Sequence, residues 1–567
     1  MDGDQPHDHA GDLPAEVTSQ VPRRRRRAPW RLPTVRRLAR GVAIGLAVLV
    51  PAAAWGVTTA QTQASLGPHL AHYEVTVDHL VTIDLGPLGT VVIDSPLPLT
   101  LGVAVVVQEI PREVTAVDEA STLEALGADL QGYVQFFGSP EATLGTAVSG
   151  LAADAARRSL LAALALVLGA VAVRALLGPR RRAEVAAALV PYRLLAGSVA
   201  LGLVMAGTLT SSGPAVPSGD DAQAASAVFD GTPLEGARLT GRLAGVIDTY
   251  GGYVVDAYRT NETFYDGAVA ALDVAWAGRA ALDEAMAALR AEHDPPDVPD
   301  GGVDDPGTDE PVVLLVVSDL HCNVGMARVI RRVAELAAVD VVLNAGDSTV
   351  NGTAVEQYCV AAFAAAAPHG VTTVISDGNH DSVETSAQEA EAGAVVLDGG
   401  VVEVDGLRIL GDADPNATRI GAGTRLAGEE GLAQAGTRLA DVACADGDVD
   451  LLLVHTPAVG TEAMERGCVP VQVSGHLHRR YGPGRVGDGV RYVSASTAGA
   501  TLDQPTVGPL QGFAELTILR VDPATRRVTD HRLVRVGPDG AVTVGLAVAW
   551  PTGASVPSGT APSSAPR

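Results

Sequence analysis

Short stretches rich in aspartate and histidine recur through the second half of this 567-residue chain. They read Ser318-Asp319-Leu320-His321, Gly346-Asp347, Gly378-Asn379-His380-Asp381, His455-Thr456-Pro457 and Gly475-His476-Leu477-His478. Carboxylate and amide oxygens together with imidazole nitrogens are ligands for divalent cations, and one carboxylate remains to bridge two ions that share a water molecule. The stretches therefore predict hydrolytic chemistry at a pair of metal ions.

Each of these stretches follows a segment with the pattern of a strand or a strand end. Residues 312–317 are a continuous run of valine and leucine, typical of a strand buried on both faces, and they lead to Asp319 and His321. We predict further strands at 339–343, 371–375, 451–454 and 469–473 and helices at 324–338 and 355–367. Because α/β sheets carry their chemistry in the loops after such strands, we expect the candidate ligands to converge.

In their order along the chain, the stretches resemble the motifs of the calcineurin-like metallophosphoesterase superfamily. Those motifs are D-x-H, G-D, G-N-H-D/E, a single H and G-H-x-H, and the likeness extends over roughly residues 311–535. The resemblance implies an α/β fold, a four-layer αββα sandwich, in the C-terminal half. It also implies a metal-dependent phosphoric ester hydrolase.

The resemblance further implies a role for each motif residue. Asp319, His321 and His478 would hold one divalent ion, Asn379, His455 and His476 the other, and Asp347 would bridge both. A metal-bridging hydroxide would attack phosphorus in line. His380 would act as the general acid beside the metals, with Asp381 orienting its imidazole. The mixed oxygen and nitrogen donors suit manganese, iron or zinc and do not choose among them.

The residues after Asp347 bear on the substrate. The protein serine/threonine phosphatase branch has an arginine here that grips the substrate phosphate, whereas this chain continues Ser348-Thr349-Val350-Asn351-Gly352. The pattern is closer to the phosphodiesterase-like branch, which favours a phosphodiester over a monoester. The alternative is a noncatalytic sensor or assembly protein of the membrane that keeps the fold and the metals. The intact His380-Asp381 pair favours the enzyme.

The net charge argues against one class of partner, and the cysteines leave open whether a disulfide forms. A formal net charge of −26 argues against nucleic-acid binding, which needs a basic surface. Cys444 and Cys468 could pair in an oxidising compartment or remain as free thiols. We expect Cys322, beside a candidate ligand, to serve packing alone.

Three apolar segments predict a multi-pass protein of the plasma membrane. Residues 41–60 form an uncharged run long enough to cross a bilayer, and 159–177 and 194–210 are the second and third candidates. Arginines crowd the segments 1–40 and 178–193, which should therefore be cytoplasmic. Three spans place the catalytic half outside the cell. The predicted partners are thus a phosphate ester and the lipid bilayer.

The remaining segments have a weaker signal. Alternation of polar and apolar residues predicts a small β-rich extracytoplasmic module within 61–158, and 211–292 reads as a mixed region with a helix near its end. Residues 293–310 are rich in Asp, Pro and Gly and predict a linker to a catalytic domain at 311–550. The tail at 551–567 is expected to be disordered.

Overall fold

The computed structural model describes most of the chain. The described residues are 32–66, 69–86, 89–98, 100–108, 140–189, 227–230, 235–241, 243–293, 310–420, 422–501, 506 and 508–551. The third predicted span, the linker after His293 and the tail after Pro551 lie outside them.

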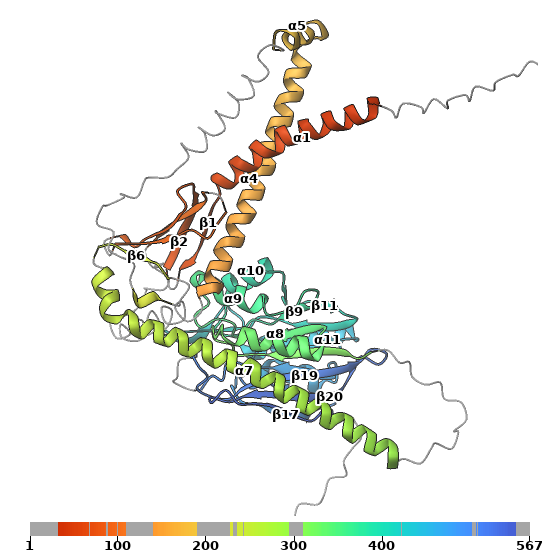
Figure 1. The fold of residues 1–567 in the computed structure, drawn as a ribbon. Coiled ribbons are helices and arrows are strands. Elements are labelled where there is room, and N and C mark those ends of the chain that lie inside the picture. Colours follow the sequence, from red (N-terminus) through yellow and green to blue (C-terminus); the bar gives the residue numbers. More distant parts are fainter. Residues whose placement is uncertain are drawn as a thin grey trace, which may run out of the picture.

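The C-terminal half is built on two mixed β-sheets (Figure 1). The larger has eight strands in the order β10-β9-β8-β7-β19-β20-β21, with β22 also paired to β20. Its strands are β7 (Val312–Val317), β8 (Val341–Asn344), β9 (Thr372–Ile375), β10 (Val395–Val396), β19 (Ala514–Asp522), β20 (Arg527–Val536), β21 (Val542–Val544) and β22 (Val548–Ala549). Strands β7 to β10 are parallel, as their pairing registers show.

The second sheet has the order β11-β12-β15-β16-β18-β17. Its strands are β11 (Val401–Val404), β12 (Leu407–Gly411), β15 (Leu451–Leu453), β16 (Val471–Ser474), β17 (Tyr481–Val486) and β18 (Gly489–Val493). A hairpin of β13 (Asn416–Arg419) and β14 (Gly423–Leu426) follows β12. Strands β12, β15, β16 and β18 pair in parallel, so their carboxyl ends meet at one edge.

The two sheets face each other across a shared apolar core. Leu314 and Leu343 of the larger sheet belong to the same buried cluster as Ile409 and Leu453 of the smaller one. Helices α8 (Met326–Ala337), α9 (Gln357–Ala364) and α10 (Val383–Glu391) belong to the larger-sheet side, and α11 (Leu432–Asp446) and α12 (Thr461–Glu465) to the smaller-sheet side. Short 3₁₀ turns η4 (Ala354–Glu356) and η5 (Pro457–Gly460) precede α9 and α12. The mixed α/β architecture predicted for this half is confirmed.

A long helix outside the motif region contributes to a second apolar core, on the other face of the larger sheet. Helix α7 (Leu243–His293) has 51 residues and lies along the outer face of the larger sheet (Figure 1). Tyr265 and Leu272 are fully buried against α8 and the sheet. The Tyr265 hydroxyl donates to Asn323 Oδ1 at 2.8 Å, in the loop after β7. The domain boundary near Pro311 stays a prediction, but the apolar core of the catalytic half includes residues before it.

The N-terminal part consists of helices and a separate sheet. Helices α1 (Leu32–Thr58) and α4 (Pro140–Leu176) pack against the sheet of strands β1 (Gln61–Leu66), β2 (His69–Thr76), β3 (Leu80–Asp84), β4 (Thr90–Asp94) and β5 (Gly102–Val107), and α5 (Pro179–Leu189) lies at the far end of α4 (Figure 1). These strands join β6 (Arg238–Leu239), after η3 (Ala227–Phe229), in a six-stranded sheet. Helices α1 and α4 pack against each other, and Gly56 lies directly against Ser159.

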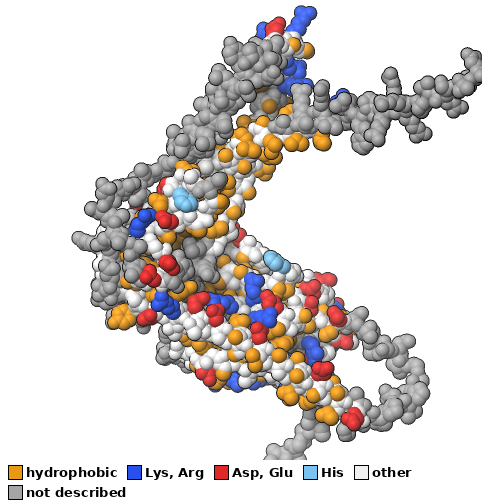
Figure 2. Space-filling model, viewed as in Figure 1, with side chains coloured by type: hydrophobic (Ala, Val, Ile, Leu, Met, Phe, Trp, Pro, Cys, Tyr) orange, Lys and Arg blue, Asp and Glu red, His pale blue; other side chains and the backbone are white. Residues whose placement is uncertain are grey.

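Within the described residues, one helix is long and apolar enough to cross a membrane. It covers Gly145–Leu176, and Ile44–Thr58 is a shorter apolar helix. Large apolar side chains of both helices are exposed, among them Leu49, Leu164 and Leu168. Figure 2 shows hydrophobic side chains along the crossing helices and basic side chains near α5.

All four cysteines are paired in two disulfides. Cys322 joins Cys359, with Cα atoms 5.1 Å apart, and Cys444 joins Cys468, with Cα atoms 4.9 Å apart. The pairing that the sequence left open between Cys444 and Cys468 is therefore formed. The prediction that Cys322 serves packing alone is wrong, because Cys359 at the third residue of α9 faces the loop after β7.

Candidate metal centre

The predicted ligands lie at the carboxyl ends of parallel strands in the two sheets. Asp319 and His321 follow β7, Asp347 follows β8, Asn379 follows β9, His455 follows β15, and His476 and His478 follow β16. Because both sheets direct these ends to the same edge of the sandwich, residues up to 159 positions apart in the chain meet there.

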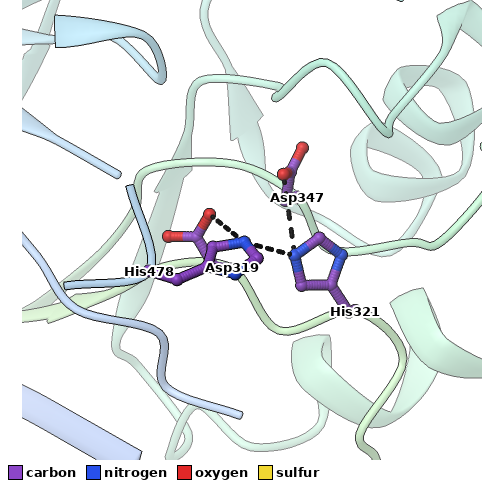
Figure 3. A group of neighbouring side chains, drawn as sticks. All are labelled: Asp319, His321, Asp347 and His478. Atoms are coloured by element: carbon purple, nitrogen blue, oxygen red, sulfur yellow. Dashed lines mark hydrogen bonds and ion pairs between the residues drawn. The ribbon is translucent and has the colours of Figure 1, made fainter. Parts of the chain in front are cut away.

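Four of these side chains form one group (Figure 3). Asp319, His321, Asp347 and His478 each offer a ligand atom, and these atoms all lie within 4.8 Å of one another. His478 Nε2 lies 3.0 Å from His321 Nε2 and 3.4 Å from Asp319 Oδ1. His321 Nε2 lies 3.7 Å from Asp347 Oδ2. These are the spacings of donors around a single ion with bonds of about 2.0–2.2 Å.

A second group shares Asp347 with the first. Asp347 Oδ2 lies 3.2 Å from His455 Nε2, which is 3.1 Å from Asn379 Oδ1. Asn379 Oδ1 also lies 2.9 Å from His476 Nδ1. The carboxylate of Asp347 thus contacts members of both groups, which is the arrangement that a bridging ligand requires.

The hydrogen bonds of His455 show that this donor set fits a cation. Its Nδ1 donates to the Ala345 carbonyl at 2.6 Å, so Nε2 presents its lone pair to the oxygens of Asp347 and Asn379. Acceptors that face one another this closely need a positive charge between them. When that charge is a proton, burial lowers the pKa of His455 but the Asp347 carboxylate raises it to about 10. A divalent ion satisfies the same atoms.

Burial differs across the centre. Asp319, Asp347 and His455 are almost completely buried, whereas His476 is exposed and His478 is partly exposed. Burial lowers the pKa of His321 to about 3, which keeps its imidazole neutral and able to bind a metal. Burial would raise the pKa of Asp347, but the facing His455 and His321 lower it below its ordinary value. The centre is therefore closed to solvent on the side of Asp347 and His455 and open to solvent on the side of His476 and His478.

The backbone at the centre is unusual. Five of the seven candidate ligands, Asp319, His321, Asp347, His476 and His478, have positive φ angles between 40° and 72°. Such a conformation costs a non-glycine residue on the order of 1–3 kcal/mol and is found where function requires it. The cluster of strained residues at one edge of the sandwich independently indicates a functional site.

Two motif glycines permit the close approach of these loops. A Cβ on Gly475 would overlap Ser318 Oγ and the Asp319 carboxylate, and a Cβ on Gly378 would overlap Asp347. The absence of a side chain lets the His476 amide donate to Asp319 Oδ1 at 3.0 Å and the His380 amide to Asp347 Oδ1 at 2.9 Å. Backbone donors thus fix both carboxylates.

His380 lies beside the centre. Its ring stands edge-on to the His321 ring, with centroids 4.9 Å apart. Nδ1 donates to the Val350 carbonyl at 2.7 Å, so Nε2 is the remaining ring atom for acid or base chemistry.

Asp381 does not orient His380 through its side chain, in contrast to what we predicted. Its carboxylate accepts from the amides of Gly378, Ser348 and Thr349 at 2.9, 3.2 and 2.9 Å. Burial and the nearby Asp377 and Asp347 carboxylates raise the pKa of Asp381 to about 7. These bonds instead tie the loop after β9 to the loop after β8.

The hairpin β13–β14 supplies contacts that the motifs did not predict. Asn379 Nδ2 donates to Thr418 Oγ1 at 2.7 Å, which turns Oδ1 of the amide toward His455 and His476. The Arg419 guanidinium donates to the carbonyls of Asn379, His380 and Asp381 at 2.7–3.1 Å. No motif contains Thr418 or Arg419, so the sequence offered no signal for either.

Comparison with known proteins supports this description of the C-terminal half. Residues 312–480 match the family model described as calcineurin-like phosphoesterase. No curated protein matches the chain.

Several solved structures show local likeness at low identity. An archaeal phosphodiesterase is 15% identical, with a TM-score of 0.26, over 40% of this chain and 100% of its own. The NAD nucleotidase of Haemophilus influenzae is 17% identical, with a TM-score of 0.25, over 42% of this chain and 49% of its own. A dimetal phosphatase from Danio rerio is 12% identical, with a TM-score of 0.28, over 43% of this chain and 100% of its own. TM-scores this low carry no argument by themselves.

The family match and the motif order agree. The domain that contains residues 312–480 is a member of the calcineurin-like phosphoesterase superfamily.

Proposed function

We propose that this protein is a membrane-anchored hydrolase that cleaves phosphoric esters with two divalent metal ions. The observation that carries the proposal is the convergence of six ligand-type side chains around Asp347, with the donor atoms of neighbouring residues 2.9–3.7 Å apart. The membership of residues 312–480 in the phosphoesterase superfamily supports the reaction class.

The residues divide into two ligand sets. Asp319, His321 and His478 would hold one ion, Asn379, His455 and His476 the other, and Asp347 both. Divalent ions bound there would supply Lewis acidity that activates water and neutralises phosphoryl charge. Manganese, iron and zinc all suit these donors.

His380 would serve the leaving group. The Val350 carbonyl holds the proton on Nδ1, so Nε2 is the atom that would hold or transfer a proton at the leaving oxygen. The rigid loops around His380 would keep the ring in place during the reaction.

The surroundings of the centre support a diester as the preferred substrate. A monoester dianion is usually gripped by a free arginine, but the donors of Arg419 are used by backbone carbonyls. Val350 contacts His380 through its backbone carbonyl, and its side chain carries no positive charge that could bind the phosphate.

The location proposed for the protein is the outer side of the plasma membrane, with more than one span. The exposed apolar faces of α1 and α4 and the arginines beside α5 support the anchor and its orientation. Two disulfides in the catalytic half are typical of an oxidising compartment. Arg157 and Arg158 lie on the unexpected side, but both pair with Asp154, at 2.6 and 2.5 Å, which reduces their weight as a topology signal.

The test uses the full chain purified in detergent. Hydrolysis of bis(p-nitrophenyl) phosphate and p-nitrophenyl phosphate is measured with manganese, and bound metal is measured by elemental analysis. Asp347→Asn should lose about 10³-fold or more in turnover, because several kcal/mol of electrostatic stabilisation depend on the bridging carboxylate. Its matched control is Asp488→Asn, a change at an exposed turn.

A second variant tests the acid. His380→Ala should retain both metals and lose roughly 10²- to 10⁴-fold in turnover, whereas His369→Ala, at an exposed position, should not change it. Two bound metals with no turnover of either ester would overturn the proposal that the protein is an enzyme and favour a noncatalytic metal-binding protein of the membrane.

A further inference from the structure

We propose that Glu356 is the positioning residue for His380, acting through the backbone of residues 350–353. The inference rests on the proposed function, because it concerns the acid of that reaction. Glu356 lies in η4, outside every motif, and its side chain is mostly buried beneath the loop that follows Asp347.

The carboxylate of Glu356 accepts four hydrogen bonds from residues 350–353 of this loop. Oε1 accepts from the amides of Val350 and Asn351 at 2.7 and 3.0 Å. Oε2 accepts from the amide and the hydroxyl of Thr353 at 2.8 and 2.9 Å. A single carboxylate thus fixes the backbone amides of three residues, and hydrogen bonds to a carboxylate are stronger than those to a neutral acceptor.

The loop in turn grips His380 and the residues around it. The Val350 carbonyl accepts from His380 Nδ1 at 2.7 Å, and Thr349 Oγ1 donates to the His380 carbonyl at 3.2 Å. Ser382 Oγ donates to the Gly352 carbonyl at 2.6 Å. A Cβ on Gly352, whose φ is 63°, would crowd Ser382 and the His380 carbonyl. The two loops are therefore in close contact on both sides of the imidazole.

The Val350 carbonyl can hold the His380 ring only while its own peptide plane is held. The amide of Asn351, which lies in the same peptide unit as the accepting oxygen, and the amide of Val350, in the preceding unit, both donate to Glu356, so the backbone is anchored on both sides of Val350. No side-chain carboxylate contacts Nδ1 of His380 among the described residues, and Asp381 is committed to other amides. Glu356 is thus the charged group that determines the orientation of the acid.

A purely structural role is the competing explanation, because the same bonds to Thr353 form a capping box for η4. The two explanations differ in their consequences. A capping role would affect stability and all substrates alike. A positioning role would affect the substrates that depend on the acid, and it would disappear when His380 is removed.

The experiment compares Glu356→Gln, His380→Ala and the double variant in the full chain loaded with manganese. Glutamine keeps the size of the side chain but presents an amide to the backbone N–H groups. The matched control is Glu391→Gln, at an exposed position in α10. The substrates are methyl p-nitrophenyl phosphate, whose leaving group needs little protonation, and methyl phenyl phosphate, whose leaving group needs more.

We expect Glu356→Gln to lower kcat for the phenyl ester by about 10- to 100-fold, with a loss for the nitrophenyl ester at least fivefold smaller, because only part of the general-acid contribution depends on orientation. KM and metal content should be unchanged. The double variant should be no slower than His380→Ala. Equal losses on both esters, or additive losses in the double variant, would overturn the proposal.

Hydrogen exchange of the backbone gives a readout that does not depend on turnover. In Glu356→Gln, the amides of 350–353 should exchange at least tenfold faster, while peptides from β7 and β15 keep their rates. Unchanged exchange in this loop would also overturn the proposal. If the wild-type chain hydrolysed no ester, the proposed function would fail, and normal exchange in the variant would separately reject the anchoring by Glu356.

Discussion

The catalytic sandwich and the N-terminal helices differ in where their apolar side chains lie, buried in the first and exposed in the second. In the sandwich, Asp319 and Asp347 are buried and hydrogen-bonded at the end of the strands, while apolar residues fill the space between the sheets. In α1 and α4, Leu49 and Leu168 point outward and are more than half exposed. Contiguous exposed apolar surface of this extent is rare on soluble proteins. The difference is what the proposed membrane anchor predicts, with a water-facing sandwich and a lipid-facing pair of helices.

The largest effect that would test the water-facing half is expected at α7. Tyr265→Ala should lower the free energy of unfolding of the catalytic half by about 3–5 kcal/mol, because it opens a cavity and leaves Asn323 Oδ1 without its donor. Chemical denaturation of the purified chain measures this. Tyr253→Ala, at an exposed position of the same helix, should have no comparable effect. Equal stabilities would show that α7 is not part of the catalytic core.

The two disulfides sharpen the comparison within the catalytic half. Replacing either cysteine pair with serine should cost roughly 3–4 kcal/mol, since the bonds close loops of similar length. Only the Cys322/Cys359 double variant should also weaken metal binding, because Cys322 follows the candidate ligand His321. Calorimetric titration with manganese compares the two. Equal affinities would contradict a link between this disulfide and the centre.

A charge placed on α4 tests the lipid-facing half. Leu168→Arg should raise the free energy of membrane insertion of this helix by about 2.5–3.5 kcal/mol, the cost of an arginine near the centre of a span. An insertion assay with the isolated α4 segment measures the shift. In the full chain, Val383→Arg on the exposed start of α10 should leave membrane association unchanged. Insertion of the variant at the wild-type level would remove the distinction between the two regions.

The smallest effect concerns a buried acid in the sandwich. Burial and the Asp377 carboxylate raise the pKa of Glu389 well above its ordinary value. The folded state therefore binds this proton more tightly than the unfolded state, so the stabilisation is complete below the ordinary pKa and is lost as pH rises toward the folded value. The slope is at most about 1.4 kcal/mol per pH unit. Glu389→Gln should reduce the fall in melting temperature that occurs as the pH rises above 5. If the variant shows the same dependence of melting temperature on pH as the wild type, that dependence arises from another group.

The sequence was sufficient for those elements whose signal is local. The run 312–317 coincides with β7, and the strands predicted at 339–343, 371–375, 451–454 and 469–473 begin within two residues of β8, β9, β15 and β16. The spacing of aspartate and histidine at their ends was enough to predict which side chains would meet. Periodicity and strand-end position are properties of short segments, so a single sequence can reveal them.

The contacts that the sequence could not reveal depend on tertiary structure. The partner of His380 is the backbone carbonyl of Val350, and every residue type carries a carbonyl. Cys322 and Cys359 are 37 positions apart and pair only because α9 returns to the loop after β7. Helix α7 begins at Leu243, whereas the sequence indicated a helix only near the end of 211–292; the packing of Tyr265 and Leu272 against α8 and the larger sheet is a tertiary contact that periodicity does not reveal.

Helix α4 has a consequence for where the protein can act. It contacts α9 of the catalytic domain near its start and continues without interruption into its exposed apolar segment. The part before Leu160, in which Ala147 and Leu151 pack against the N-terminal sheet and are not available to lipid, measures about 30 Å at 1.5 Å per residue. With the apolar part embedded in lipid, the continuous helix would hold the metal centre at a fixed height above the bilayer, which a flexible linker would not. The enzyme would then sample a fixed layer above the bilayer, and substrates anchored closer to the lipid or projecting farther from it would escape cleavage.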